Sequence, residues 1–548
     1  MAKDFSVIIG GRAGDGIDKS GLIIARILSE LGYRIYIERD YPSIIRGGHT
    51  FSMIRACEEK IFCPKTKIDF LLALNQDCIS FHKDKLVNPD SVIYDPDAVK
   101  STGMPISATA IIKEENAPTV TRNSCMVAAF CKATGIEWGI LEKVFKDNIS
   151  REIELNLKVA LKAYNEAKEL LKIEKLAQKP LPLFTGSETI GMGLVKGKMD
   201  AYLAYPMTPS SPILHFLAEQ AQNFGIKVIH PESEIAVIMM ALGFSYAGKR
   251  AAVGTSGGGF CLMTEGLSFS AMAELPVIII MGQRTGPSTG LPTYSGQTEL
   301  NFVLNAGHGE FVRFIAGPGD LEEAHFWSQA AMNISWRYQI PSFIMTDKTL
   351  NEACASFDES MAGGIEEEAV LWDKTKPYKR YLDTENGISS FAFPGTKDAI
   401  VKINSYEHEE SGITIEDTVT TKKMQDKRLR KKDIILKELE EKYEMVKTYG
   451  NADSPTALLT WGSNKGACIE IGKKLGLKVI IPSVLSPFPK NQFALAMKGN
   501  KKLVCVECNA TGQLANLVSN CGFKVDEKIL KYDGRPFFLE EIEKALTS

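Results

Sequence analysis

The stretch PVIIIMGQRTGPSTGLPT (276–293) carries an apolar run directly into a loop of glycine, proline and hydroxyl residues. AYPMTPSSP (204–212) repeats this arrangement after a shorter apolar run. Continuous apolar runs bounded by turn residues are typical of strands that a parallel sheet buries on both faces. Ligands bind at the carboxyl ends of such strands. The two stretches therefore predict an α/β domain whose strand-end loops form a ligand site.

The two loops offer side chains suited to binding an organic acid. Arg284 follows its strand directly, where a guanidinium can hold a carboxylate through two parallel hydrogen bonds. Thr208, Ser210 and Ser211 place hydroxyls beside the expected start of a helix, and Pro206 stiffens the turn. Each loop also has a structural interpretation, a Ser/Thr helix cap in one and an arginine paired with a structural acid in the other. Two such loops in one domain favour a binding site.

HPESEIAVIMMALGFSYAG (230–248) places two acids, Glu232 and Glu234, just before a strongly apolar helix. A glutamate at this position is usually a solvated first-turn residue that the helix dipole favours. The alternative is a partly buried acid with a shifted pKa, which is typical of functional sites.

The rest of the chain indicates a multi-domain α/β protein, since 548 residues exceed what one hydrophobic core can hold. Strands alternate with helices from 1 to 175, and this alternation predicts a mainly parallel sheet. A Lys/Pro-containing linker leads to a second α/β domain at 186–355. A polar segment at 356–450 contains DKRLRKKDIILKELEEKYEMVK, expected to be an exposed helix with a solvated charge run. A smaller α/β domain spans 451–548.

GGRAGDGIDKS (10–20) nearly matches two phosphate-binding motifs. A P-loop needs lysine directly after its second glycine, but two residues separate Gly16 from Lys19. Gly14-Asp15-Gly16 opens the motif that holds diphosphate through Mg²⁺ in thiamine enzymes. The asparagine that this motif requires is missing, because the first one downstream is Asn75. The chain is therefore expected to bind no metal, and a glycine turn remains that either holds an anion or permits tight packing.

Composition excludes several classes of protein. A net charge of -3 provides no bulk attraction to nucleic acid or to an anionic membrane. No apolar stretch is long enough to span a bilayer, and we expect a cytoplasmic protein. The eleven cysteines are scattered rather than clustered as an iron–sulfur site requires. Cys505 and Cys508 are expected to be core thiols, because an odd offset of three places their side chains on opposite faces of a strand.

The motifs together resemble the alpha subunits of 2-oxoacid:ferredoxin oxidoreductases. AYPMTPSSP, ESEIA, GTSGGGFCLMTEG, QRTGPSTGLPT and AGHGEF occur in this family's order. GRAGDG (11–16) and YPSIIRGGHTFSMIR (41–55) resemble the family's gamma domain, fused ahead of alpha. Met207, the triplet Gly257-Gly258-Gly259 and Cys261 depart from the residues that the family usually has there.

The resemblance implies an architecture and a role for each site residue. The architecture is a gamma-like domain, a pyrimidine-type thiamine diphosphate domain and a domain like the carboxyl-terminal domain of transketolase. Thr208 and Arg284, with Ser210 and Ser211 beside them, would bind the oxoacid. Glu234 would be the catalytic residue and would contact the aminopyrimidine ring of the cofactor, and Pro206 would also contact the cofactor.

The resemblance also implies partners and a reaction. A beta subunit would carry Mg²⁺ and a [4Fe-4S] cluster, face the thiamine diphosphate and form an (alpha-beta)2 assembly that passes electrons to ferredoxin. Coenzyme A would accept the acyl group, assisted by the gamma-like domain through Gly14 and Gly16 or through Arg46, Gly47 and Gly48. We expect 2-oxoglutarate as substrate, with pyruvate and branched-chain oxoacids next.

The sequence leaves two alternative functions, a nicotinamide dehydrogenase and a non-catalytic scaffold. A self-sufficient nicotinamide dehydrogenase is disfavoured by the broken glycine fingerprint of the first domain. A non-catalytic scaffold that binds coenzyme A or a nucleotide would be expected to lack Thr208, Arg284 or Glu234, and the sequence has all three.

Overall fold

The computed structural model describes residues 4–43, 48–364, 368–374 and 376–547. The chain divides into two compact units. Unit 1 comprises residues 1–184 with 353–358 and 537–548, and unit 2 comprises 185–352 and 359–536. The predicted α/β class is confirmed. The unit boundaries differ from the expected domains, because the last helix, α19 (Leu539–Thr547), belongs to unit 1.

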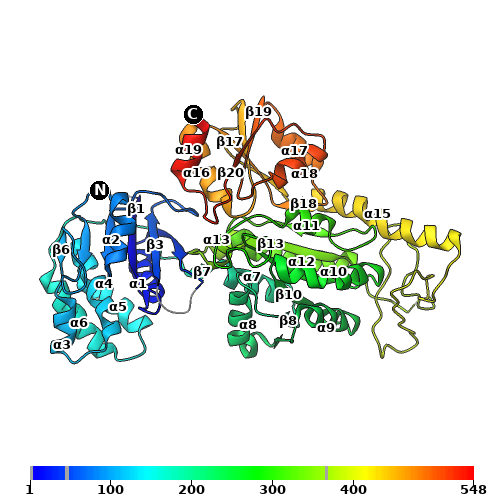
Figure 1. Cartoon of the computed structure of the whole chain (residues 1–548). Helices are drawn as coiled ribbons and strands as arrows, with labels where there is room; N and C mark the ends of the chain where they lie inside the picture. Colours follow the sequence, from blue (N-terminus) through cyan, green and yellow to red (C-terminus); the bar gives the residue numbers. More distant parts are fainter. Residues whose placement is uncertain (1–3, 44–47, 365–367, 375, 548) are drawn as a thin grey trace. The chain divides into compact units, whose positions relative to one another are not determined.

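Unit 1 is built on an eight-stranded sheet in the order β6-β5-β4-β1-β3-β2-β14-β7 (Figure 1). Its strands are β1 (Asp4–Arg12), β2 (Arg34–Asp40), β3 (His49–Cys57), β4 (Phe70–Ala73), β5 (Val92–Tyr94), β6 (Met104–Pro105), β7 (Leu183–Thr185) and β14 (Cys354–Ser356). Its other helices are α1 (Ile17–Glu30), α2 (Gln76–His82), α3 (Ala108–Glu114), α4 (Arg122–Ala133), α5 (Trp138–Asn148) and α6 (Ile153–Glu166).

The expectation of a mainly parallel sheet is wrong for unit 1. β1 pairs in parallel with β4, but β3 runs antiparallel to both β1 and β2. The physical reason is the connection between β2 and β3, which spans only residues 41–48. A parallel pair needs a crossover of a dozen or more residues, so this short connection can join only antiparallel strands.

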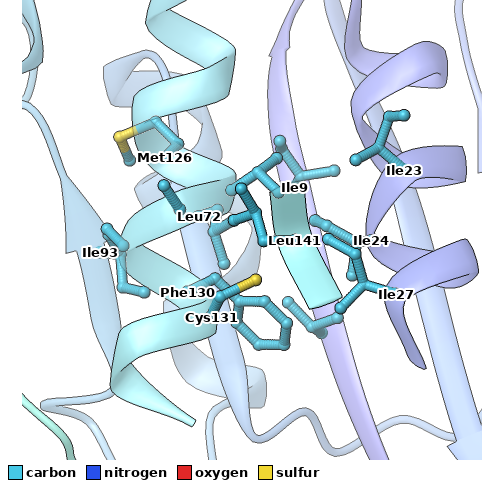
Figure 2. Close-up of a cluster of buried hydrophobic side chains, with 14 of the residues drawn as sticks. Ile9, Ile23, Ile24, Ile27, Leu72, Ile93, Met126, Phe130, Cys131 and Leu141 are labelled. Carbon is cyan, nitrogen blue, oxygen red and sulfur yellow. The ribbon is translucent and has the colours of Figure 1, made fainter. Parts of the chain in front are cut away.

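The core of unit 1 lies between this sheet and its helices, and Figure 2 shows part of it. Ile9 of β1, Ile24 of α1 and Phe130 of α4 belong to this cluster, and each of these side chains is 0% exposed. The glycine turn at Gly14 and Gly16 follows β1 and precedes α1. The packed core therefore fixes the position of that turn.

Unit 2 contains a seven-stranded sheet in the order β18-β12-β13-β11-β10-β8-β9. All neighbours are parallel except β12 and β18, so the expectation of a parallel sheet is confirmed here. The strands are β8 (Ala201–Ala204), β9 (Lys227–Ile229), β10 (Ala251–Thr255), β11 (Val277–Gln283), β12 (Phe314–Ala316), β13 (Pro341–Asp347) and β18 (Val484–Ser486). The helices are α7 (Gly186–Lys196), α8 (Ser211–Phe224), α9 (Glu234–Tyr246), α10 (Gly257–Met272), α11 (Leu300–Asn305), α12 (Leu321–Tyr338), α13 (Lys348–Glu352) and α14 (Glu359–Ala362).

A five-stranded sheet in the order β15-β17-β16-β19-β20 completes unit 2. Its strands are β15 (Val446–Gly450), β16 (Thr456–Leu459), β17 (Lys478–Pro482), β19 (Lys502–Glu507) and β20 (Glu527–Leu530), accompanied by α16 (Lys465–Leu475), α17 (Lys490–Met497) and α18 (Gln513–Asn520). Trp461, which follows β16, is fully buried in a core shared with the seven-stranded sheet.

The charged helix α15 (Thr418–Lys442) is more buried than its sequence indicates. Lys427 and Lys431 are 0% and 2% exposed, and both ammonium groups contact the carboxylate of buried Glu274. The expectation that this charge run is simply a solvated face is therefore wrong for one side of the helix. Leu439 and Tyr443, near the end of the helix, pack into a hydrophobic core of unit 2.

Candidate functional site

The candidate site lies where four adjacent strands of the seven-stranded sheet end. β9, β8, β10 and β11 are neighbours and run in parallel, so their carboxyl ends meet at one edge. The AYPMTPSSP turn follows β8, the Gly257–Gly259 turn follows β10 and Arg284 follows β11. α9, which begins at Glu234, follows β9. The sheet thereby brings the motifs that contain Thr208, Glu234 and Arg284 to one edge, together with the Gly257–Gly259 segment.

Arg284 joins two of the predicted loops directly. Its Nη1 donates to the backbone carbonyl oxygen of Thr208 at 2.8 Å. Among the described residues, its other guanidinium nitrogens have no hydrogen-bond partner and no carboxylate within ion-pair distance. The structural alternative of an arginine paired with a nearby acid is therefore not what this structure shows. Arg284 is held on one side and keeps donors for an incoming anion.

The hydroxyl residues of the turn after β8 differ in burial and in hydrogen bonding. Ser210 is 1% exposed and its Oγ donates to the carbonyl of Met207 at 2.8 Å, which stabilises the turn. Thr208 and Ser211 are half-buried, and Pro206 is exposed. Thr208 and Ser211 thus keep part of their surface exposed, whereas the hydroxyl proton of Ser210 serves the fold.

The structure distinguishes the two acids before α9. Glu232 is exposed, whereas Glu234 is 4% exposed. Ser233 caps the helix through a bond from Ala236 N, so the Glu234 carboxylate is not used as the cap. Within the described ranges, that carboxylate has no hydrogen-bond or ion-pair partner. A buried acid without a partner is costly in a folded protein, so Glu234 has the environment expected of a ligand-binding group.

The first turn of α10 is open enough to receive side chains from both sides. A Cβ added to Gly259 would lie 2.5 Å from Glu234 Oε1, and one added to Gly257 would lie 2.8 Å from Glu299 Oε1. Both distances are shorter than real Cβ contacts allow. The glycines therefore let two buried carboxylates, Glu234 and Glu299, lie against the same helix N-terminus.

Glu299 is 9% exposed, and burial raises its pKa to about 7. Its Oε1 lies 2.7 Å from the hydroxyl of Thr298, which also lies 3.0 Å from the carbonyl of Arg284. Its Oε2 is buried without a hydrogen-bond partner in the described structure. Glu299 is therefore linked to the site, because the Thr298 hydroxyl connects its carboxyl group to the backbone carbonyl of Arg284.

In unit 1 the glycine turn has the backbone that its sequence requires. Gly14 and Gly16 have φ values of 99° and 77°, a region that favours glycine. Asn123 holds the turn by donating to the carbonyl of Asp15 at 2.6 Å. Gly48 also has positive φ, at 74°. Arg46 and Gly47, predicted for the same purpose, lie outside the described residues.

A cavity of about 710 Å³ begins at Gly16 and continues between α1, α4, α5 and α6. Lys19, Arg26 and Arg151 contribute cations to its lining, and no aspartate or glutamate lines it. In the described part of the chain, none of these three cations has an ion-pair partner. An uncompensated positive lining favours a phosphorylated or carboxylated ligand.

The described residues contain no group of three or more His, Cys, Asp or Glu side chains placed to hold a metal ion. Cys505 and Cys508 are both free and buried, as predicted for core thiols, and burial raises the pKa of each thiol. Over the same residues, no helix combines the length and apolarity needed to cross a membrane.

Two families of known proteins match the two regions that carry these sites. Residues 192–428 match the thiamine diphosphate-binding region of pyruvate flavodoxin/ferredoxin oxidoreductases, and residues 6–166 match the pyruvate ferredoxin/flavodoxin oxidoreductase family. Fold and site thus define a subunit of a thiamine-diphosphate-dependent oxidoreductase. A 2-oxoacid:ferredoxin oxidoreductase alpha subunit from a Sulfolobus species is 31% identical, with 99% of this chain and 96% of the relative covered. The chain belongs to the family of 2-oxoacid:ferredoxin oxidoreductase alpha subunits.

Other relatives agree with this assignment. The corresponding subunit from Saccharolobus solfataricus is 29% identical over 99% of this chain and 97% of its own length. A solved structure of 2-oxoglutarate:ferredoxin oxidoreductase from Magnetococcus marinus, with 2-oxoglutarate, coenzyme A and succinyl-CoA bound, has a TM-score of 0.91 at 27% identity. It covers 100% of this chain and 99% of the other.

Two further buried acids, Glu299 and Asp347, lie at the site outside the residues that the motifs predict. Asp347 is the last residue of β13 and accepts a hydrogen bond from Ser463 Oγ at 2.5 Å. Its place at a strand end, like that of Arg284, was a usable signal. Glu299 lies fifteen residues beyond Arg284 in a loop, and no local pattern distinguishes it from a surface acid.

Proposed function

We propose that this subunit binds the 2-oxoacid and one side of thiamine diphosphate, for a CoA-dependent oxidative decarboxylation to acyl-CoA and CO₂ or its reverse. The observation that carries the proposal is the position of Arg284. Its guanidinium is fixed on the Thr208 carbonyl and retains free donors at the edge where the predicted site residues meet. A bidentate pair with the substrate carboxylate would fill those donors.

Glu234 would hold the aminopyrimidine side of the cofactor. Support comes from its burial, its lack of a partner in the described residues and the close approach that Gly259 permits. When bound, thiamine diphosphate supplies the carbon nucleophile and the electron sink that decarboxylation of a 2-oxoacid needs. Glu234 would stabilise one tautomer of the aminopyrimidine ring, because its carboxylate can accept or share a proton with the ring.

Unit 1 would bind coenzyme A through the cavity that begins at Gly16. Coenzyme A carries several phosphate charges, and Lys19, Arg26 and Arg151 supply cations that no described acid neutralises. The start of α1 adds backbone amides beside Gly16. Gly14 contributes the turn that positions them, while Arg46, Gly47 and Gly48 stay a second candidate contact.

A beta subunit would cover the exposed apolar side of α9 and α10. Ile235 and Met239 on α9 are 55% and 45% exposed, and Leu262 on α10 is 51% exposed. They line a groove of about 630 Å³. Contiguous exposed apolar surface marks interaction sites, and this surface begins next to Glu234. The beta subunit would bring Mg²⁺ and the [4Fe-4S] cluster, pass electrons to ferredoxin and form an (alpha-beta)2 assembly in the cytoplasm.

The substrate is proposed to be 2-oxoglutarate. Support comes from a Methanocaldococcus jannaschii relative named as the KorA subunit of 2-oxoglutarate synthase, 29% identical over 66% of this chain. The Magnetococcus marinus structure also contains 2-oxoglutarate. The test is to measure kcat/KM of the complex with its beta subunit for 2-oxoglutarate, pyruvate and a branched-chain oxoacid. A clear preference for 2-oxoglutarate is expected, and an equal or higher value for either competitor would overturn the substrate assignment.

A matched pair of variants tests the proposed coenzyme A site. Arg26→Ala should raise KM for coenzyme A and leave KM for the oxoacid nearly unchanged. Lys143→Ala, which removes a cation of unit 1 that is already paired with Glu30, is the control and should change neither constant. If Arg26→Ala behaves like the control, or raises KM for the oxoacid instead, the coenzyme A site lies elsewhere.

A further inference from the structure

The hydroxyl of Thr298 has two acceptors but only one proton. Its Oγ1 lies 3.0 Å from the backbone carbonyl of Arg284 and 2.7 Å from Glu299 Oε1. If Glu299 is ionised, the hydroxyl can donate to only one of them. If Glu299 carries a proton, both hydrogen bonds of Thr298 form at the same time, as two links of one chain. The carboxyl group then donates to Thr298, and Thr298 donates to the carbonyl of Arg284.

The surroundings of Glu299 favour the protonated form. Gly257 lets the side chain lie flat against the start of α10, where water is largely excluded. Oε2 has no partner in the described structure, and an unpaired buried charge is far more costly than an unpaired neutral oxygen. Gln283 Oε1 accepts from the backbone N–H of Glu299 at 3.3 Å and offers the carboxylate no donor there.

We propose that Glu299 is a positioning residue for oxoacid binding: its proton completes a chain through Thr298 that holds Arg284 in its binding position. The inference rests on the proposed role of Arg284 in binding the oxoacid. It names a further residue for that site and a dependence of oxoacid affinity on pH.

Two charged groups face Glu299 from neighbouring elements. Arg284, after β11, acts on it electrostatically and opposes the effect of burial. Glu234, at the start of α9, lies against the same turn of α10. Because burial is the larger effect, the pKa of Glu299 is raised to about 7, and the carboxyl group changes its charge in the physiological range.

Ionisation of Glu299 has two consequences that act in the same direction. The carboxylate competes with the Arg284 carbonyl for the Thr298 proton, which loosens the backbone of the binding loop. It also attracts the Arg284 guanidinium in competition with the carboxylate of the substrate. Oxoacid affinity should therefore fall as pH rises through about 7.

The test compares the pH dependence of oxoacid KM in the complete complex for the wild type and Glu299→Gln. If only the protonated form binds well, wild-type KM should rise by up to ~10-fold per pH unit above the pKa. Glu299→Gln keeps a donor toward Thr298 at every pH, so its KM should stay flat and close to the low-pH wild-type value. KM for coenzyme A should not share this step.

Two further variants separate positioning from a general structural effect. Thr298→Ser keeps the hydroxyl and should retain the wild-type pH step, whereas Thr298→Val should raise oxoacid KM at all pH values. An infrared band of a protonated carboxyl group should titrate near neutrality in the wild type and be absent from Glu299→Gln. If Arg284→Ala raises oxoacid KM but Glu299→Gln keeps the wild-type step, Glu299 has no such role. If Arg284→Ala leaves oxoacid KM unchanged, the proposed binding site itself is wrong.

Discussion

Arg284 is held by the Thr208 carbonyl on one side and open on the other. In its proposed role it would bind the substrate carboxylate in the ground state and the transition state alike. Removing one partner of such a charged contact typically costs about 2–5 kcal/mol. Arg284→Ala should therefore lower kcat/KM for the oxoacid at least ~30-fold, mainly by raising KM. Arg284→Lys should recover little, because an ammonium group cannot reproduce the planar fork. Steady-state kinetics of the complex measure both effects, and unchanged oxoacid kinetics would show that the loop is structural.

Glu234 should have a different kinetic signature, because it is proposed to contact the cofactor rather than the substrate. Glu234→Gln should depress kcat and slow the exchange of the cofactor's C2 hydrogen for deuterium, with little change in oxoacid KM. Exposed Glu232 provides a matched control two residues away, and Glu232→Gln should leave both rates near the wild-type values. If deuterium exchange is normal in Glu234→Gln but slow in Glu232→Gln, then Glu232 and not Glu234 is the acid that contacts the cofactor.

The raised pKa of Glu299 also predicts a pH dependence of stability. Burial raises the pKa to about 7 from its ordinary value of 4.5, so the folded state binds more protons than the unfolded state between these values. The contribution of the protonated carboxyl group is fully present below about pH 4.5 and is lost as pH rises through about 7. Glutamine does not titrate, so Glu299→Gln does not lose stability in this way. The melting temperature of the variant minus that of the wild type should therefore increase from acid to alkaline pH. A constant difference across the range would contradict the raised pKa.

At the scale of single elements, the helix α15 is held by a buried ion cluster. Lys427 Nζ lies 2.6 Å from Glu274 Oε1, Lys431 contacts Oε2, and Arg380 Nη2 donates to the Glu274 carbonyl at 2.7 Å. Burial by itself raises the pKa of the Glu274 carboxyl group, but the neighbouring ammonium groups outweigh it and hold this pKa well below its usual range. The carboxylate is thus the counter-ion that allows these cations to be buried.

Removing that counter-ion should destabilise the fold. Glu274→Gln leaves the ammonium groups of Lys427 and Lys431 without a charge partner, and breaking a buried pair in this way costs about 3–5 kcal/mol. Denaturant unfolding measures the loss. Asp426→Asn on the exposed side of α15, where Asp426 pairs with the exposed Lys422, is the control and should have little effect. Equal stability of the two variants would show that the cluster contributes nothing to folding.

Elements with a strong local pattern could be predicted from the sequence. The apolar runs before the two site loops predict β8 and β11 at nearly their observed positions, because buried parallel strands need continuous apolar sequence. An apolar run looks alike in parallel and antiparallel strands, so strand direction in unit 1 depends instead on the connections, as the short one between β2 and β3 illustrates. The burial of Lys427 and Lys431 was not predictable, because their partner Glu274 lies about 150 residues away and only the tertiary fold brings it close.

The same distinction holds for the site. Arg284, Thr208 and Glu234 follow strands or begin a helix, and their positions could be anticipated from these local patterns. The close contact between the Arg284 and Thr208 loops depends on β8 and β11 flanking β10, which only the sheet order shows. The place of Glu299 at the site could not be predicted, because it depends on the hydrogen bonds of Thr298 and on the space beside Gly257, which only the fold shows.

At the scale of the whole molecule, we propose that the chain holds part of a catalytic centre. Unit 2 gathers the residues proposed for the oxoacid and the cofactor ring, and unit 1 has the cation-lined cavity. The described residues include no metal-binding cluster, and the glycine turn lacks the asparagine of the diphosphate motif. The exposed apolar side of α9 and α10 is the surface proposed to bind the beta subunit.

The most direct test of this account is oxoacid- and CoA-dependent reduction of a viologen dye by the purified chain, alone and after addition of its beta subunit. The chain alone is expected to give no turnover and to bind no Mg²⁺–thiamine diphosphate tightly. Addition of the beta subunit should restore activity, and Arg284→Ala in the same mixture should reduce it. Turnover by the single chain at the rate of the complex would contradict the account, because it would show that the whole catalytic centre lies in this polypeptide.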